Sequence, residues 1–573
     1  MLLKAIKTQV ETRLESSLHN RVYIIPSQDK NPNQVEHPWS IDVKAGSKPK
    51  VRLPQNTHII TVFDQEGVDG RLLILGQPGA GKTTMLLELA KKLVEQAEND
   101  LNEPIPILLS LSSWQNDQQS ITDWIVAELN SGKYYYKVRK DITKQWLEHG
   151  EIIPLFDGLD ELAAPRQEQC VKKLNEFLQP GNWIYPLVVC SRIEEYQVYS
   201  TKLALNTSLE LQPFSDEQIQ EYLRHTGNEQ LGNSIKDDRE LRQLAQTPFL
   251  LNVIVLTYQK LSLDMWQEFE SSAQRLNYLF AAYVEVMLGR KYEGKRPSDE
   301  TTKHWLSWLA GKLIEQNQTE FFIEKMQPSW LEDRRHEQIY RLSVRLSVGL
   351  SVGLFFGLSV GLFFGLSVGL AFGLNIELIG GIRTSEILQF SRKIFGWQGL
   401  IVGLIFGLIF GLIFGLIFGL IVGLIVGLMG ELIEGLVGGF KSSEIETRTS
   451  PNQGIWESLK NAVIVGLIGG LVFGLIGGLI FELMVGLSVG LIFGLIGGLI
   501  GGLGGGLANG GQACIQHFIL RFTLYRNGYM PWNYARFLDY ATDRLFLQRV
   551  GGGYRFMHDL LRQHFAQNYR SLR

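Results

Sequence analysis

The sequence predicts an α/β fold built on a parallel sheet, followed by mainly helical regions and interrupted by an all-helical, glycine-rich insert. Short apolar runs without alternation, such as residues 72–75, are separated by helical patterns, as in a parallel sheet covered on both faces. Charged residues make up 20% of the 573 residues but are spread unevenly. Residues 346–510 are almost uncharged and dominated by Gly, Leu, Ile, Val and Phe, so this segment forms a region of its own.

Composition excludes several classes of protein. The net charge of -3 argues against a general nucleic-acid-binding surface. The three cysteines, Cys170, Cys190 and Cys514, are too far apart for a zinc site or a disulfide framework, which favours a reducing compartment. The charged N-terminal turns do not resemble a signal peptide. Residues 1–20 instead predict a packing helix with an apolar residue at every fourth position, and a membrane-surface anchor is the alternative.

A glycine-rich loop follows the apolar run 72–75. It fits the P-loop pattern G-x-x-x-x-G-K-[ST], in which backbone N–H groups approach phosphate oxygens. Lys82 would supply a charge for the β- and γ-phosphates, and the Thr83 hydroxyl would ligate Mg²⁺. A chance match is the alternative, but a strand pattern before the loop and a helix pattern after it argue against that. The predicted nucleotide-binding residues of the loop are Gly76, Gln77, Pro78, Gly79, Ala80, Gly81, Lys82, Thr83 and Thr84.

An acidic cluster follows the apolar run 151–156. This arrangement is typical of a Walker B strand, in which Asp157 would hold Mg²⁺ through water, opposite Thr83. Asp160 or Glu161 would position or deprotonate the attacking water. The alternative is an acidic turn that only caps a helix.

A further apolar run, 186–190, ends in Ser191 and Arg192. Placed beside the Walker B strand, Arg192 could reach a γ-phosphate. The alternative is an arginine paired with surface acids such as Glu194.

These motifs together resemble the NACHT-type NTPases of the STAND class. The resemblance rests on GQPGAGKTT, LFDGLDEL, VVCSR and residues 211–215, and it continues in QTPFLL and in residues 546–561. It implies that Pro248 abuts the adenine. It also implies that His558, near the end of a winged-helix domain, contacts the β-phosphate of ADP, although a lone histidine at a helix start is usually structural.

The resemblance covers residues 1–345 and 512–573 and is closest to bacterial membrane-associated NACHT proteins. It implies an ADP-bound closed monomer that opens and forms a homo-oligomer when ATP replaces ADP, with slow ATP hydrolysis and a role in defence against phage. No effector domain is recognised before the NTPase and no repeat sensor after the winged helix. The trigger and any sensing partner are not identified by the sequence.

The insert contains three blocks of glycine-rich sequence, at 346–374, 399–430 and 462–508. Each exceeds the roughly 20 apolar residues needed to cross a bilayer. Glycine at every fourth position is the small-xxx-small pattern of helices that pack closely in lipid. A buried soluble bundle is the alternative. One crossing in each of the first two blocks and two in the third, with a turn near Glu482, gives four crossings. The NTPase and the C-terminus then lie on the cytoplasmic side of a bacterial inner membrane.

The predicted organisation is an N-terminal helix and connector (1–54), an AAA-like P-loop NTPase domain (55–211), a helical domain with the start of the winged helix (212–345), the insert (346–510) and the winged-helix end (511–573). The leading function is a membrane-embedded switch controlled by ATP and ADP with Mg²⁺. An ATP-driven transport or channel protein is the alternative, which the scarcity of charge in the insert disfavours. A third possibility is that the insert is only an anchor.

Overall fold

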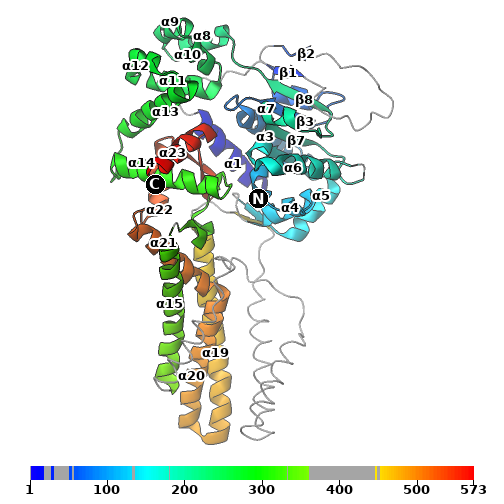
Figure 1. The fold of residues 1–573 in the computed structure, drawn as a ribbon. Coiled ribbons are helices and arrows are strands. Elements are labelled where there is room, and N and C mark those ends of the chain that lie inside the picture. The colour runs from blue at the N-terminus through cyan, green and yellow to red at the C-terminus, as the bar shows by residue number, and fades with distance from the viewer. Residues whose placement is uncertain are drawn as a thin grey trace. The chain divides into compact units, whose positions relative to one another are not determined.

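The structure is a computed structural model, and it describes residues 2–18, 28–30, 51–54, 57–131, 136–179, 181–331, 333–360, 445–447, 452–550 and 552–572. The chain divides into two compact units (Figure 1). The first, which we call the sheet unit, comprises Met1–Phe321, Glu444–Thr449 and Ala535–Arg573. The second, which we call the hairpin unit, comprises Phe322–Ser443 and Ser450–Tyr534.

A parallel sheet forms the centre of the sheet unit, as predicted. Its five parallel strands are β3 (Arg71–Gly76), β4 (Ile105–Ser110), β6 (Ile152–Asp157), β7 (Leu187–Arg192) and β8 (Thr207–Leu211). They lie in the order β8-β3-β7-β6-β4, and two short strands, β1 (Gln28–Lys30) and β2 (Val51–Arg52), continue the sheet antiparallel beyond β8. Every residue of β3 is buried, which explains its unbroken apolar run.

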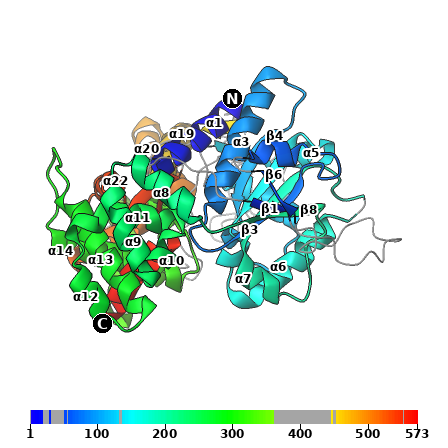
Figure 2. The ribbon, with the colours of Figure 1, turned by 90° about the horizontal axis from the view of Figure 1, so that it is seen from above.

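Helices cover both faces of this sheet. They are α2 (Ile59–Phe63), α3 (Lys82–Asn99), α4 (Ile121–Asn130), α5 (Lys140–His149), α6 (Ala164–Phe177) and α7 (Ile193–Val198). Figure 2 shows α3 on one face and α6 and α7 on the other. This follows from right-handed crossovers, because β3 connects to β4 in one direction across the sheet, whereas the later strands return in the other. The carboxyl ends of β3, β6 and β7 therefore meet at one edge.

The N-terminal helix α1 (Leu2–Leu18) is a packing helix, as predicted. Leu2, Ile6, Val10 and Leu14 are buried in the same hydrophobic core as the sheet, and α1 packs against α3. The apolar face that the four-residue spacing predicted is thus used within the unit, which disfavours the membrane-surface alternative.

A helical region follows the sheet. Its helices are α8 (Asp216–His225), α9 (Glu229–Asp237), α10 (Arg239–Ala245), α11 (Pro248–Thr257), α12 (Leu263–Glu268), α13 (Ser272–Gly289) and α14 (Asp299–Glu315). Pro248 occupies the first turn of α11, where its missing N–H costs nothing.

The C-terminal part of the sheet unit adds a small antiparallel sheet. Its strands β9 (Glu320–Phe321), β11 (Leu547–Val550) and β12 (Gly553–Phe556) lie in the order β11-β12-β9. Helices α22 (Tyr534–Asp543) and α23 (Asp559–Leu572) flank β11 and β12 in the sequence, and α23 packs against α14. The winged-helix assignment of this region stays a prediction.

One short strand of the predicted insert belongs to the sheet unit. Strand β10 (Ile445–Thr447) pairs antiparallel with β5 (Tyr136–Val138) of the NTPase region. The predicted crossing at 399–430 and the end of the first block, 361–374, lie outside the described residues.

The hairpin unit consists of long helices. They are α15 (Arg334–Val360), α19 (Gln453–Val485), α20 (Leu487–Gly506) and α21 (Gln512–Arg526). Helices α19 and α20 lie side by side and antiparallel (Figure 1). They are joined at Gly486, whose φ of 112° is open to glycine but strained for other residues. The turn predicted near Glu482 is therefore at Gly486.

Glycines allow the two backbones of this hairpin to touch. A Cβ added to Gly498 would lie 2.7 Å from the carbonyl oxygen of Gly470, and one added to Gly494 would lie 2.8 Å from that of Gly474. The repeating glycines thus form the contact face between α19 and α20. This is the close backbone approach that the small-xxx-small pattern predicts for helices packed in lipid.

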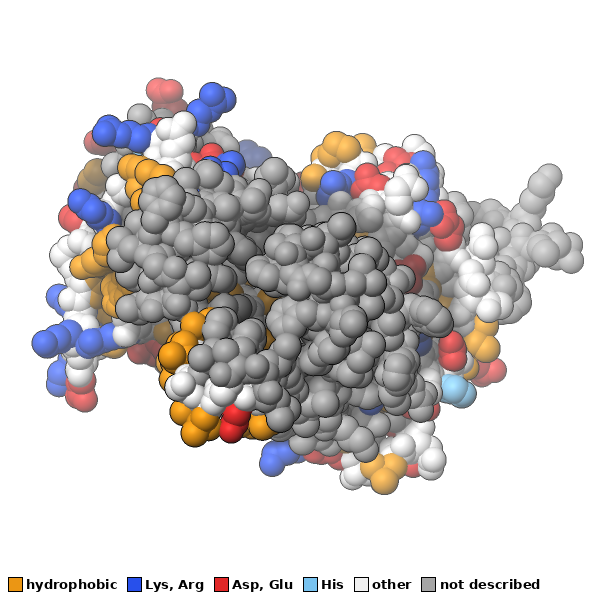
Figure 3. All heavy atoms as spheres, turned by 90° about the horizontal axis from the view of Figure 1, so that it is seen from below, with side chains coloured by type: hydrophobic (Ala, Val, Ile, Leu, Met, Phe, Trp, Pro, Cys, Tyr) orange, Lys and Arg blue, Asp and Glu red, His pale blue; other side chains and the backbone are white. Residues whose placement is uncertain are grey.

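Leucines form the outer surface of the hairpin. Leu467, Leu471, Leu491 and Leu495 are each between 64% and 70% exposed. The space-filling view from the turn end shows hydrophobic side chains gathered on the hairpin (Figure 3). In the part of the chain that the structure describes, two segments are long and apolar enough to cross a membrane, Gln453–Leu475 and Gly490–Arg526. Length and composition alone support this assignment, which gives weak evidence for membrane association.

We expect Gly498→Ala to destabilise the hairpin by about 1–3 kcal/mol, because the added methyl group collides with backbone that cannot move aside. Gly504→Ala is the matched control, since no described atom lies within 4 Å of its Cβ position and alanine favours the helix. Hydrogen exchange of α20 amides in detergent should rise for the first variant and stay level or fall for the second. Equal exchange in both would contradict this packing.

Candidate nucleotide-binding site

The loop between β3 and α3 forms a cradle of backbone amides. Gly79 and Gly81 have φ values of 79° and 97°, which only glycine adopts without strain. A Cβ on Gly79 would lie 2.8 Å from Thr247 Cγ2, so a side chain there would also collide with the segment before α11. Helix α3 begins at Lys82, and its positive end points at the loop. The Lys82 ammonium donates to the carbonyl oxygens of Gly76 (2.8 Å) and Gln77 (3.0 Å).

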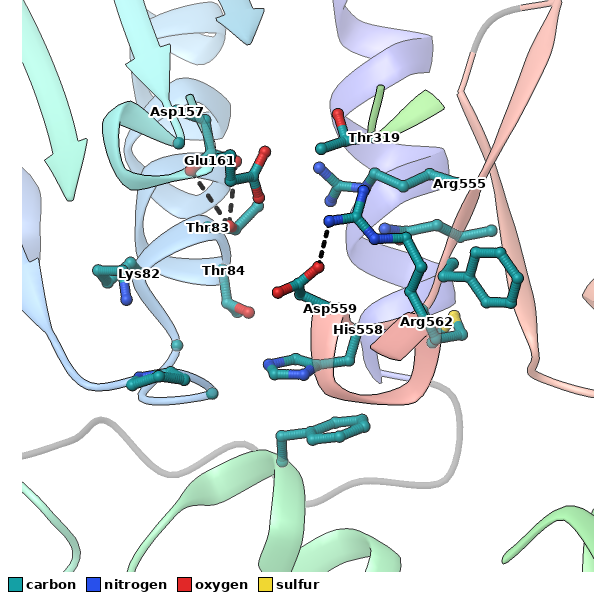
Figure 4. Close-up of a pocket in the computed structure, with 18 of the residues that line it drawn as sticks. Lys82, Thr83, Thr84, Asp157, Glu161, Thr319, Arg555, His558, Asp559 and Arg562 are labelled. Carbon is teal, nitrogen blue, oxygen red and sulfur yellow. Dashed lines mark hydrogen bonds and ion pairs between the residues drawn. The ribbon is translucent and has the colours of Figure 1, made fainter. Parts of the chain in front are cut away.

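The end of β6 faces the start of α3. The Thr83 hydroxyl donates to the Asp157 carboxylate, with Oγ1 3.0 Å from Oδ2 and 3.2 Å from Oδ1 (Figure 4). A hydroxyl and a carboxylate are the hard oxygen donors that Mg²⁺ prefers. Together with the amide cradle, this donor set fits a nucleotide phosphate chain and its Mg²⁺.

Asp160 and Glu161 are placed differently. The Asp160 carboxylate accepts hydrogen bonds from the Arg192 backbone N–H (2.9 Å) and side-chain Nε (2.8 Å), and it is nearly buried. Glu161 lines the pocket. Burial, together with the neighbouring Asp157 and Asp160, raises the pKa of Glu161 to about 8. At neutral pH a carboxyl group with this pKa is mostly protonated, and a cation bound at Asp157 would lower its pKa and favour the carboxylate.

Arg192 joins the ends of β6 and β7 to the C-terminal region. Besides Asp160, its guanidinium pairs with Asp559 (3.0 Å) and Glu195 (3.3 Å). The nearby acid that pairs with Arg192 is Glu195, and not Glu194, which was the predicted alternative. The contact of Arg192 with Asp559 is an ion pair between residues 367 positions apart in the sequence. Arg192 is therefore both a pocket residue and a link between the sheet and α23.

The segment before α23 and the start of α11 form the opposite wall of the pocket. His558 stacks on Phe249, with ring centroids 3.9 Å apart and planes 12° apart, and Pro248 lines the same wall. The His558 Nδ1 accepts a hydrogen bond from the Leu560 N–H (3.1 Å). This bond leaves Nε2 on the side of Gly79, where it would lie 3.3 Å from an added Cβ. His558 thus lies against the P-loop (Figure 4).

The charges of the pocket suit a phosphate ligand. Burial lowers the pKa of Lys82. A phosphate beside it would favour its charged form. Burial raises the pKa of Asp559, but the Arg562 and Arg192 guanidiniums outweigh that effect, so the pKa is held below its usual range. Asp559 is therefore a fixed negative charge that holds basic groups at the pocket.

The structure brings together most of the residues predicted for the site. Pro78, Gly79, Gly81, Lys82, Thr83, Thr84, Asp157, Asp160, Glu161, Arg192, Pro248 and His558 all line one pocket. Gly76, Gln77 and Ala80 do not line it. Gly76 and Gln77 act through the carbonyl oxygens that hold Lys82, and Ala80 is buried in the core.

Sequence reasoning missed several residues that line the same pocket. They are Arg13, Phe249, Thr319, Arg555, Asp559 and Arg562. Asp559 and Phe249 are adjacent to predicted residues and could have been found by extending those motifs. Arg13 and Arg555 carry no local signal, because a single arginine on a helix or strand is usually a surface residue.

Comparison with known proteins identifies the family of the central region. Residues 71–230 match the model of the NACHT domain. Among curated proteins, none matches the chain.

The search of solved structures matches the chain to Cdc6p from Pyrobaculum aerophilum (15% identity, 44% of this chain and 70% of that chain covered, TM-score 0.22). A second is the Orc1 protein from Aeropyrum pernix in complex with DNA (10% identity, 48% of this chain and 72% of that chain covered, TM-score 0.22). A third is a signal transduction ATPase with numerous domains (STAND) with a tetratricopeptide repeat sensor from Pyrococcus horikoshii (12% identity, 89% of this chain and 85% of that chain covered, TM-score 0.23). Similarity this low carries no functional argument.

Proposed function

Because residues 71–230 form a NACHT domain, a P-loop module that binds nucleotide with a divalent metal, we propose that the chain is a nucleotide-controlled signalling switch of the STAND class. In this proposal ADP holds the molecule closed, and exchange for ATP opens it and drives homo-oligomerisation. The glycine-rich insert embeds the switch in a bacterial membrane, and its biological role is defence against phage.

The pocket itself is the observation that carries this proposal. Residues of the P-loop and of the C-terminal segment 555–562 line one cavity within the sheet unit, although more than 450 residues separate them in the sequence. A nucleotide in this cavity would contact both the NTPase domain and the C-terminal region. An added γ-phosphate would therefore change the free energy of the contact between them, as a switch requires.

The resemblance and the geometry together support the following proposed roles. The loop 76–84 binds the phosphates, Pro248 abuts the adenine, and His558 contacts the β-phosphate in the closed state. Thr83 and Asp157 hold Mg²⁺, which would supply positive charge against the β- and γ-phosphates. Arg192 senses the γ-phosphate, and its ion pair with Asp559 gives that signal a route to α23.

Slow hydrolysis is assigned to Glu161 rather than to Asp160. Asp160 is engaged by two groups of Arg192, so its carboxylate is a positioning group for that arginine. Glu161 lines the pocket, and Mg²⁺ held at Asp157 would favour its ionised form, which can take a proton from the attacking water.

Membrane embedding is supported by the hairpin unit. Its leucines are exposed to solvent in an arrangement that lipid would cover, and its glycines are used in helix contact. Single exposed leucines are common on soluble proteins, but a continuous surface of them favours a membrane or a partner.

The pairing of β10 with β5 supports the proposed topology. It keeps the segment between the second and third glycine-rich blocks in the sheet unit. An even number of crossings must then precede β10, and the α19–α20 hairpin contributes two after it. We propose four crossings, with the sheet unit on the cytoplasmic side.

The first test uses the purified full chain in detergent. The co-purifying nucleotide is identified, and the particle mass is measured before and after ADP is exchanged for a non-hydrolysable ATP analogue. Bound ADP and a larger mass after exchange are the expected results, because the γ-phosphate should open the closed monomer.

The same experiment can also contradict the proposed switch. A chain without bound nucleotide, with fast ATP turnover and one unchanged mass, would contradict the switch and favour an ATP-driven transport protein. Replacing the insert with an unrelated membrane hairpin would then distinguish a signalling insert from an anchor, since an anchor tolerates the exchange.

A further inference from the structure

Helix α1 brings a basic side chain to the nucleotide pocket from outside every recognised motif. Arg13 lines the pocket, and its side chain is 7% exposed. Its Nη2 lies 3.9 Å from Asp157 Oδ2. The apolar side of α1 is buried against α3 and the sheet, so packing holds Arg13 at this place. The position is therefore a property of the fold and not of a flexible surface arginine.

Asp157 is a shared partner in this arrangement. The same carboxylate accepts the Thr83 hydroxyl and, in the proposed function on which this inference rests, holds Mg²⁺. A guanidinium and Mg²⁺ attracted to one partly buried carboxylate repel each other, and the reduced dielectric of the pocket strengthens this repulsion. Binding of Mg²⁺ must then weaken the contact of Arg13, and the docked Arg13 must weaken binding of Mg²⁺ by the same factor.

We propose that the Arg13 guanidinium supplies the positive charge at Asp157 when Mg²⁺ is absent. Its charge supports nucleotide binding when Mg²⁺ is absent, and Mg²⁺ entry loosens the C-terminal half of α1 from the pocket. Arg13 is a positioning residue in this scheme, since it acts through Asp157.

A second feature of α1 fits a helix that is docked under strain. Gln9, one turn before Arg13, is completely buried, and neither polar atom of its amide has a hydrogen-bond partner among the described residues. A buried unpaired amide costs free energy that is regained when water reaches it. Helix α1 also packs against β4 and β11. A loosening of α1 would therefore also change the packing of the small C-terminal sheet.

The test measures the affinity of the full chain in detergent for ADP, once with Mg²⁺ and once with EDTA. We expect Arg13→Gln to increase the ratio of the EDTA to the Mg²⁺ dissociation constant on the order of tenfold, within the usual range of coupling between sites. Metal-free binding should weaken, and binding with Mg²⁺ should stay level or tighten. Arg13→Lys keeps the charge and should give a ratio closer to that of the wild type.

Lys7→Gln is the matched control, because it removes an exposed ion pair between α1 and Glu98 on α3 without entering the pocket. Its ratio should equal that of the wild type. An unchanged ratio in Arg13→Gln would overturn the inference. A wild-type chain that binds no ADP in either condition would instead contradict the proposed function.

A measurement on the wild type covers the case in which Arg13→Gln does not fold. Hydrogen exchange of the amides in the C-terminal half of α1 should rise when Mg²⁺ is added to the ADP-bound protein. Exchange that does not change on adding Mg²⁺ would overturn the inference without any variant.

Discussion

Replacing Lys82 by alanine should weaken the binding of ATP and ADP on the order of 100-fold or more. The ammonium lies inside the amide cradle, held by the carbonyl oxygens of Gly76 and Gln77, and burial disfavours its charge unless an anion is bound. Hydrogen bonds from a buried cation to phosphate contribute about 3 kcal/mol or more in total, on the order of 100-fold in the dissociation constant. Isothermal titration of the full chain in detergent measures this loss.

Lys92→Ala is the matched control for that experiment. Lys92 lies on the same helix, α3, but it is exposed, and among the described residues its ion pair is with Glu95 one turn away. Its loss should leave nucleotide affinity unchanged, because exposed pairs contribute little. A Lys82→Ala protein that binds ATP as tightly as the wild type would show that the site is elsewhere.

The second large effect is expected for Glu161→Gln. Glutamine keeps the shape of the side chain but cannot take a proton from the attacking water. We expect the rate of ATP hydrolysis to fall on the order of 100- to 1,000-fold, as for the loss of a general base. The affinity for ATP should change little, because none of the proposed phosphate contacts is made by Glu161. Single-turnover hydrolysis and a separate binding assay distinguish the two effects.

Two further variants make this prediction specific. Glu176→Gln removes an exposed carboxylate of α6 that pairs with Lys173, and its hydrolysis rate should equal that of the wild type. Asp160→Asn should instead loosen Arg192, so its main effect should be on the response to the γ-phosphate. If Asp160→Asn abolished hydrolysis while Glu161→Gln hydrolysed normally, the two roles would have to be exchanged.

Local patterns account for the parts of the site that could be predicted. The P-loop, the strand ending at Asp157 and the strand ending at Arg192 are short segments whose residue types are set by local backbone and burial. Their meeting at one sheet edge follows from the rule that parallel strands end on the same side. The predicted packing helix is confirmed over the described residues Leu2–Leu14 for the same reason, because a four-residue apolar spacing defines one helix face.

Long-range contacts account for what could not be predicted. The pairing of β10 with β5 joins segments about 300 residues apart, and a three-residue strand has too little pattern to stand out in the sequence. Arg555 and Arg13 reach the pocket only because β12 and α1 pack where they do. The different roles proposed for Asp160 and Glu161 also depend on which of the two carboxylates Arg192 contacts.

Residue type and spacing within single elements were enough to predict a phosphate-binding loop, an acidic strand end that suits a metal, and glycine-rich helices with apolar outer faces. The place of the C-terminal segment 555–562 and of helix α1 in the pocket became visible with the packed fold. Such contacts depend on the packing of whole elements, whose free energy is shared among many residues and leaves no pattern at the residues that make the contact.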